Sequence, residues 1–260
     1  MRHRLLLPCL LSLLWSPALL AAPVAKPVEW KIGSDTFSGY VVYDDSVTTP
    51  RPGLVMVPNW KGVNESALEK AHLVAGDDYV VLVADVYGKG IRPKTDAEAG
   101  PVATAMRADR PKLRARVQKA VEVLKQQPAT LVDRARIGAF GYCFGGSTVL
   151  ELVRAGDALA GVVSLHGGLA TDLPAAGAVK TPVLVLNGGD DSYVSAAEIT
   201  AFQDEMRKAD ADWQFVNFSG AVHCFAESDA QNPPGCVYHE RSARRAYRMM
   251  ADFFGEVFAK

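Results

Sequence analysis

Polar and hydrophobic residues alternate near the start of the chain and then give way to longer apolar runs. The alternation covers residues 28–32 and 37–43, which flank Gly33-Ser34-Asp35-Thr36, and it predicts an antiparallel hairpin. The apolar runs that follow are typical of strands buried on both faces of a sheet. The strands predicted after the hairpin are residues 53–57, 79–84, 136–140, 161–165, 182–186 and 213–218.

Helical periodicity separates these strands. Leu113, Val117, Val121 and Leu124 form one apolar face, with Lys and Arg residues on the other. Strands that alternate with amphipathic helices predict an α/β protein, with a mostly parallel, doubly wound sheet that follows the N-terminal hairpin and has helices on both faces. Residues 88–111, rich in Gly, Pro and charge, are interpreted as a cap or substrate-side loop. The other predicted helices are residues 147–154, 195–209 and 238–258.

The first 22 residues have the layout of a secretory signal peptide. Met1-Arg2-His3-Arg4 is a short positive segment, residues 5–20 are apolar, and Ala21-Ala22 supplies the small residues of a cleavage site. An uncleaved membrane anchor is the alternative, which the short apolar segment and its two prolines disfavour. We therefore predict one domain over residues 23–260, exported to the periplasm or outside the cell, without stable membrane insertion after cleavage.

Composition narrows the class of protein further. Hydrophobic residues make up 49% of the chain and charged residues 22%, and the net charge is −1. This balance is typical of a globular protein that can bury a sizeable core. Because the chain has no basic excess and no interleaving of basic and aromatic residues, it shows no nucleic-acid-binding pattern. We expect a small-molecule ligand, no cofactor, and a monomer or a small homo-oligomer.

Three cysteines follow the predicted leader, and their contexts differ. An oxidising compartment favours pairing, and Cys224 and Cys236 lie close together in sequence, whereas Cys143 is in a different setting. The simplest partition is a disulfide between Cys224 and Cys236 and a free thiol at Cys143. A zinc site formed by Cys224, Cys236 and His239 is the alternative, although its spacing matches no common zinc pattern.

Cys143 lies between a predicted strand and a predicted helix. Gly141-Tyr142-Cys143-Phe144-Gly145-Gly146 follows the strand at 136–140 and precedes the helix at 147–154. Strand, Gly-x-nucleophile-x-Gly and helix form the context of a nucleophile elbow, in which small neighbours allow a sharp turn. The dipole of the helix would favour the thiolate. The alternative interpretation is a structural cysteine, buried in a glycine-rich turn and without a catalytic role.

A cysteine nucleophile needs a base, and the base needs an acid that orients it. In the α/β-hydrolase fold, which this elbow context predicts, the chain order is nucleophile, acid, base. Asp190 and Asp191 follow the predicted strand at 182–186, and His223 follows the last predicted strand. We choose Asp191 over Asp190 as the orienting acid, partly on the family comparison that follows. The predicted catalytic residues are Cys143, Asp191 and His223.

At this point the chain resembles the dienelactone hydrolase family, from about Gly39 to Phe258. The resemblance implies a nucleophile at Cys143, an acid at Asp191, a base at His223, and an oxyanion hole formed by the backbone N–H groups of Trp60 and Phe144. The matching segments are Pro58 to Asn64, Ala84 to Gly88, Gly141 to Gly146, Gly188 to Val194 and Gly220 to Phe225.

The chain also departs from the family pattern. Family members usually have a glutamate at the position of Asn59, and their substrate-binding arginines fall near Lys89 and Glu227. Lys89 keeps the positive charge and Glu227 reverses it, so a dicarboxylate-like dienelactone is not the expected substrate. We expect Asn59, Tyr87, Lys89 and Tyr142 to contact the substrate.

The predicted activity is cleavage of an ester or lactone through a thioester on Cys143. A catalytically silent thiol sensor or small-molecule-binding protein on the same fold is the alternative. His166-Gly167-Gly168 resembles an oxyanion motif but follows the nucleophile in the chain, so it is interpreted as a tight turn.

Overall fold

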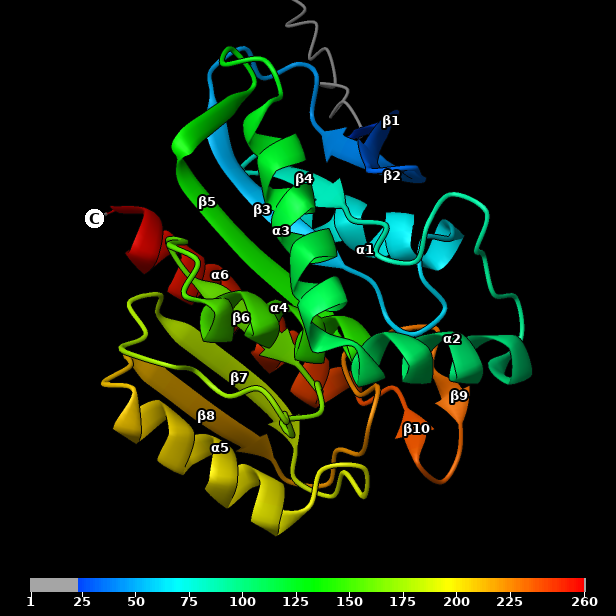
Figure 1. The fold of residues 1–260 in the computed structure, drawn as a ribbon, viewed down its shortest axis with the longest axis vertical. Coiled ribbons are helices and arrows are strands. Elements are labelled where there is room, and N and C mark those ends of the chain that lie inside the picture. Colours follow the sequence, from blue (N-terminus) through cyan, green and yellow to red (C-terminus); the bar gives the residue numbers. More distant parts are fainter. Residues whose placement is uncertain (1–22, 260) are drawn as a thin grey trace, which may run out of the picture.

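The computed structural model describes residues 23–259, so the predicted signal peptide and Lys260 lie outside the described part of the chain. Its centre is a twisted eight-stranded sheet, drawn in Figure 1. The strands of this sheet are β1 (Val24–Ile32), β2 (Asp35–Tyr43), β3 (Arg51–Val57), β4 (Val80–Val83), β5 (Val132–Tyr142), β6 (Val162–Leu165), β7 (Val183–Gly188) and β8 (Trp213–Phe218).

The strand order is β1-β2-β4-β3-β5-β6-β7-β8. β1 and β2 form an antiparallel hairpin whose turn includes Gly33 at a φ of 57°, and β2 runs antiparallel to β4. Every pairing from β4 to β8 is parallel. The predicted fold class, an α/β-hydrolase fold with an N-terminal hairpin, is therefore confirmed.

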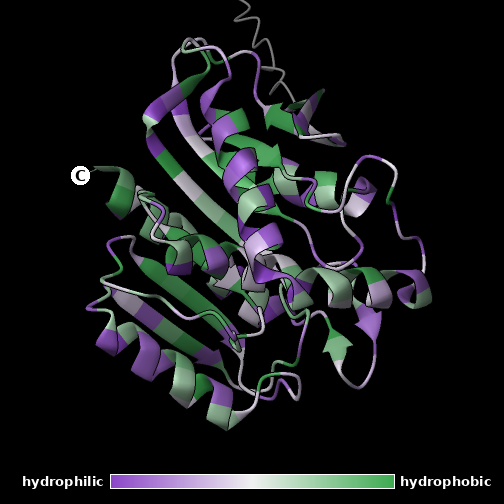
Figure 2. Ribbon diagram, in the orientation of Figure 1, coloured by the Kyte–Doolittle hydropathy of each residue, from purple (hydrophilic) through white to green (hydrophobic). Residues whose placement is uncertain are grey.

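Helices cover both faces of the sheet. One buried cluster joins a sheet face to α2, α3, α4 and α5, and a second joins the opposite face to α1 and α6. Figure 2 shows β7 as almost uniformly hydrophobic, as expected for a strand covered on both sides, whereas α5 alternates hydrophobic and hydrophilic residues. The helices are α1 (Glu65–Ala75), α2 (Asp96–Ala108), α3 (Arg110–Lys125), α4 (Phe144–Ala155), α5 (Ala196–Lys208) and α6 (Glu240–Ala259).

The segment interpreted as a loop at residues 88–111 contains α2 and the first two residues of α3. The Thr95 hydroxyl caps α2 by accepting a hydrogen bond from the Glu98 N–H at 3.3 Å, and Ala103 and Met106 pack into the core, so the helix continues past Pro101. The predicted position on the substrate side is correct, because Asp96 and Arg107 line the main cavity.

A short two-stranded hairpin, β9 (Gln231–Asn232) and β10 (Cys236–Val237), follows the last strand of the main sheet. A disulfide joins Cys224 to Cys236 and closes this segment, while Cys143 is free, as the cysteine partition predicted. Within residues 23–259, no helix combines the length and apolar character needed to cross a membrane.

Candidate active site

The nucleophile elbow is formed where β5 passes into α4. Cys143 has a φ of 52° and a ψ of −115°, a strained conformation for a residue with a side chain, and its N–H donates to the Leu165 carbonyl at 3.0 Å. The turn is so tight that a Cβ on Gly145 would lie 1.9 Å from the Val57 carbonyl oxygen. The glycines are therefore required by close backbone approach, and they hold the thiol at the carboxyl edge of the sheet.

His223 and Asp191 meet on loops that follow β8 and β7. The His223 Nδ1 lies 2.7 Å from Asp191 Oδ2, and the other Asp191 oxygen accepts the Tyr193 N–H at 2.8 Å. Asp191 is completely buried, whereas its neighbour Asp190 is exposed. The structure thus brings the imidazole to the carboxylate chosen from the sequence, and the second carboxylate of the pair faces solvent.

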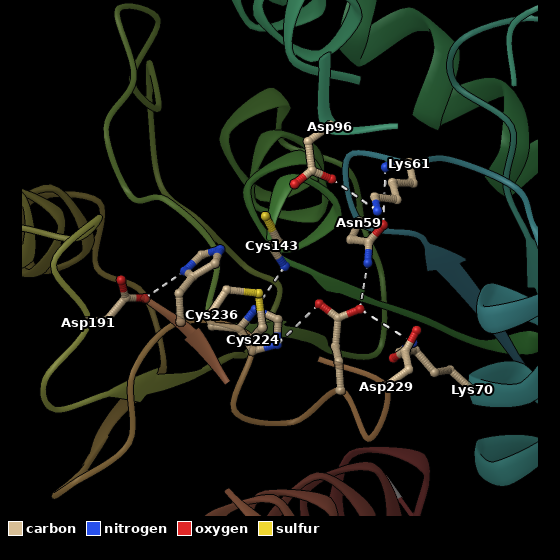
Figure 3. Close-up of a disulfide and its surroundings, with 12 residues drawn as sticks. Asn59, Lys61, Lys70, Asp96, Cys143, Asp191, Cys224, Asp229 and Cys236 are labelled. Carbon is tan, nitrogen blue, oxygen red and sulfur yellow. Dashed lines mark hydrogen bonds and ion pairs between the residues drawn. A yellow bond between two sulfur atoms is a disulfide. The ribbon is translucent and has the colours of Figure 1, made fainter. Parts of the chain in front are cut away.

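The environment of His223 favours its charged form. Burial alone would lower the pKa of this imidazole, but hydrogen bonds to Asp191 and to Cys143 raise it to about 10. In Figure 3, Cys143 lies between Asp191 and Asn59, and the dashed line from Asp191 leads to the His223 ring. Histidine and aspartate are therefore hydrogen-bonded to each other, and the histidine lines the same cavity as Cys143.

The two N–H groups expected to form an oxyanion hole belong to the residue after Cys143 and to the turn after β3. Phe144 is the first residue of α4, where backbone N–H groups have no acceptor within the helix. Trp60 lies in a turn closed by the Gly62 N–H, which donates to the Asn59 carbonyl at 2.9 Å. The Tyr87 hydroxyl donates to the Trp60 carbonyl at 3.0 Å and anchors this turn.

The site opens into a cavity of about 850 Å³, a volume in the range of small-molecule binding sites. Its wall includes side chains from the elbow, from the turn after β3, from the loops after β7 and β8, and from the segment closed by the disulfide. Among its lining residues are Asn59, Trp60, Cys143, Tyr193, His223 and Glu227.

Of the four expected substrate contacts, only Asn59 lines this cavity. Tyr87 is buried beneath the turn that carries Trp60, so it supports the site from behind. Lys89 lies at the exposed surface, where its Nζ pairs with Glu29 at 2.6 Å. The Lys89 N–H bonds to a carbonyl of β2, which ties this segment to the hairpin and away from the thiol.

Tyr142 is also not a lining residue of the cavity. Its side chain is fully buried, and its hydroxyl lies 2.9 Å from that of Tyr247 on α6. Successive side chains of a strand point to opposite faces of the sheet, and at the end of β5 Tyr142 takes the face covered by α6. The prediction that it contacts substrate is wrong for this reason.

Glu227 and His166 are site residues whose contacts were not predicted from the sequence, although Glu227 was noted there for its reversed charge. Glu227 Oε2 accepts the Asn59 side-chain N–H at 2.6 Å and lies 3.4 Å from the Lys70 ammonium. Burial raises the pKa of Glu227, although Lys70 opposes this effect. His166 is fully buried beside the elbow, and its Nδ1 accepts the Cys143 N–H at 3.2 Å. In the sequence, His166 was marked only by the His166-Gly167-Gly168 motif, which was interpreted as a tight turn.

The zinc alternative conflicts with the disulfide. Cys224 and Cys236 are bonded to each other, so neither supplies the thiolate that zinc would require. His239 instead bonds to Ser242 through its Nδ1 at 2.7 Å, near the start of α6.

The fold and the site define an α/β-hydrolase with a cysteine at its nucleophile elbow. The profile of the dienelactone hydrolase family matches residues 37–258. Because this match covers most of the chain, the protein belongs to the dienelactone hydrolase family, and it is a hydrolase of esters or lactones.

Individual relatives agree with this assignment. A solved dienelactone hydrolase-like promiscuous phosphotriesterase from metagenomic libraries is 34% identical, with a TM-score of 0.86, over 91% of this chain and 99% of its own. A dienelactone hydrolase from Anabaena variabilis is 18% identical, with a TM-score of 0.64, over 90% and 98% of the two chains, and shows the shared fold. An uncharacterized Caenorhabditis elegans protein is 32% identical over 57% of this chain and 96% of its own.

Proposed function

We propose that the protein cleaves a carboxylic ester or lactone through a Cys143–His223–Asp191 triad and a thioester intermediate. The thiolate of Cys143 attacks the carbonyl carbon, and the N–H groups of Trp60 and Phe144 receive the developing oxyanion. Each donor would lower the barrier by about 3 kcal/mol. The imidazolium then gives its proton to the leaving alkoxide as the carbon–oxygen bond breaks.

The second half of the reaction frees the enzyme. His223, now neutral, takes a proton from water, and the hydroxide attacks the thioester carbonyl. Collapse of this intermediate releases the acid and restores the thiolate and the imidazolium. The observation that best supports the proposal is the 2.7 Å hydrogen bond between His223 Nδ1 and the buried Asp191 carboxylate, beside a cavity that His223 and the free thiol of Cys143 both line.

Replacing the sulfur tests this proposal. Cys143→Ala should reduce hydrolysis of p-nitrophenyl acetate by about 1000-fold or more, and intact-mass measurement should find the acetyl adduct on wild-type protein only. If Cys143→Ala retains most of the activity, the mechanism is wrong. A reactive thiol with no turnover of any ester would favour the thiol-sensor alternative instead.

The substrate panel should contain lactones, aryl esters and one neutral phosphotriester. The phosphotriester is included because the metagenomic relative is named a promiscuous phosphotriesterase. We do not expect a dicarboxylate-like dienelactone to be the best substrate, because the acidic Glu227 lies in the cavity wall.

We also propose that the protein is exported after removal of a leader within residues 1–22. The disulfide at Cys224 and Cys236 supports this, because disulfides persist mainly in oxidising compartments. Cell fractionation followed by N-terminal sequencing of the protein tests the proposal, and a cytosolic protein that retains Met1 would contradict it.

A further inference from the structure

One buried carboxylate, that of Glu227, has no part in the triad mechanism yet contacts both sides of the site. Its side chain is only 3% exposed, and it lies in the segment that the disulfide closes. The Glu227 N–H donates to the Cys224 carbonyl at 2.9 Å. This bond ties the Glu227 backbone to the residue that directly follows His223. Burial of a charged group is unfavourable unless ion pairs and hydrogen bonds offset the loss of hydration. The contacts of both Glu227 oxygens therefore need an explanation.

The first oxygen, Oε2, holds Asn59. The Asn59 Nδ2 donates to Oε2 at 2.6 Å, and the Asn59 Oδ1 accepts the Lys61 N–H at 3.1 Å. One amide side chain therefore joins its own turn to the Glu227 carboxylate, and a dashed line at Asn59 marks this hydrogen bond in Figure 3. The Trp60 N–H belongs to the peptide that follows Asn59, so the direction of this N–H depends on how Asn59 is held.

The second oxygen, Oε1, faces His166. It lies 3.9 Å from the His166 Nε2, and neither atom has a hydrogen-bond partner within residues 23–259. Burial keeps the pKa of His166 well below its usual value, so the ring is neutral. Because Nδ1 accepts the Cys143 N–H, the ring proton is on Nε2 and is available to the carboxylate.

His166 in turn supports the elbow. The Cys143 N–H is shared between the Leu165 carbonyl and the His166 Nδ1, one residue before the N–H of Phe144. The His166 ring also packs edge-to-face against His223, with the ring centroids 5.2 Å apart. Glu227 therefore lies between the turn after β3, to which it is hydrogen-bonded through Asn59, and the elbow after β5, where its Oε1 faces the His166 ring at 3.9 Å without a hydrogen bond.

We propose that Glu227 is a positioning residue that fixes the Trp60 and Phe144 N–H groups relative to each other, acting through Asn59 on one side and His166 on the other. Oxyanion stabilisation requires both donors to lie 2.7–3.1 Å from the developing charge, so a small displacement of either one slows the reaction. Lys70, at 3.4 Å, supplies the positive charge that allows the carboxylate to be buried. This inference rests on the proposed esterase mechanism.

Glu227→Gln separates this role from others. A carboxylate accepts hydrogen bonds on both oxygens, whereas a glutamine accepts on one and donates from the other. The glutamine oxygen can therefore accept a hydrogen bond from Asn59 or from His166. Its NH2 group must then face the N–H of the other residue, where it cannot accept a hydrogen bond. With p-nitrophenyl acetate we expect kcat to fall about 10–100-fold and KM to change by less than about 3-fold.

The rate of Cys143 alkylation by iodoacetamide distinguishes the two roles. General structural damage at the site would slow alkylation as well as turnover. Alkylation needs the thiolate but develops no oxyanion, so its rate in Glu227→Gln should stay within about 3-fold of wild type. Glu205→Gln is the matched control, because it also removes a largely buried, ion-paired carboxylate but lies away from the cavity. Its kcat should equal that of wild type.

Asn59→Ala tests the path to the turn. If Glu227 acts on the turn through Asn59, Asn59→Ala combined with Glu227→Ala should be no slower than the more impaired of the two single variants, because each removes the Asn59–Glu227 hydrogen bond. Multiplying losses, an unchanged kcat in Glu227→Gln, or alkylation that slows in parallel with turnover would each overturn the inference. Failure of wild-type protein to form any acyl adduct would overturn the proposed function as well, and is thereby distinguished.

Discussion

Asp190 and Asp191 are adjacent residues with identical side chains in different environments. Asp190 is exposed, whereas Asp191 is completely buried and bonds to His223 at 2.7 Å. A carboxylate that accepts the Nδ1–H fixes the tautomer and leaves Nε2 free for the reacting groups. Only Asp191 can do this, and a difference of one position in the loop after β7 decides it.

The variants Asp191→Asn and Asp190→Asn test this difference directly. Asparagine at 191 should reduce kcat by about 10²- to 10⁴-fold, and the pKa of His223 should fall because one of the hydrogen bonds that raises it is weakened. The pH profile of kcat/KM should then lose its alkaline limb at a lower pH than in wild type. Asp190→Asn should behave as wild type, and the reverse pattern would refute the assignment.

The three residues wrongly expected to contact substrate show that residue type does not determine where a side chain points. Tyr87, Lys89 and Tyr142 flank sequence motifs of the site, yet they hold a turn, pair with a surface glutamate and fill the core, respectively. Proximity in sequence to a motif does not determine the direction of a side chain. That direction follows from the strand register and from what packs against it.

At the scale of elements, the elbow depends on how closely β3, β5 and α4 approach one another. An added methyl group at Gly145 would meet two backbone carbonyl oxygens, those of Val57 and Pro58, at 1.9 and 2.5 Å. Neither oxygen can rotate away as a side chain could. The helix must therefore move outward or the turn must open.

Gly145→Ala should consequently destabilise the protein by about 3 kcal/mol or more and impair alkylation and turnover together. Urea unfolding with an iodoacetamide assay at low urea measures both effects. Gly177→Ala is the control, because no atom lies within 4 Å of the added Cβ there, and its stability should match wild type. Wild-type stability in Gly145→Ala would show that the turn is less tightly packed than described.

Helix α2 was not predicted from local sequence, whereas the disulfide of the segment 224–236 was. A high content of Gly, Pro and charge indicated an irregular loop at residues 88–111, but the Thr95 cap and packing of α2 on the core outweighed it. The pairing of Cys224 with Cys236 was predictable from spacing, because the alternatives required Cys143, whose motif had another role.

For the whole molecule, two buried histidines give opposite contributions to the dependence of stability on pH. The pKa of His166 is lowered by burial, so below about pH 6.5 the unfolded chain binds a proton that the folded ring excludes, and stability falls on acidification. The pKa of His223 is raised to about 10, so its contribution is fully present below about pH 6.5 and is lost as the pH rises through about 10.

His166→Asn tests the acid side of this balance, and asparagine suits the positive φ of 39° at this position. The free energy of unfolding should fall less between about pH 7.5 and about pH 5 in the variant than in wild type. Urea titrations at several pH values measure the difference. Parallel curves would mean that the folded protein accepts a proton on His166 as readily as the unfolded chain does.

The sequence by itself determined the order of the main-sheet strands and of four helices, the elbow with its glycines, and the chain order of cysteine, aspartate and histidine, because these depend on periodicity and on local steric requirements. Only the tertiary structure decided which side chains face the thiol. Glu227 is 84 residues from Cys143 in the chain, and it meets Asn59 and faces His166 only after the parallel strands bring their carboxyl ends to one edge. Such contacts follow from packing across that edge, which no local pattern encodes.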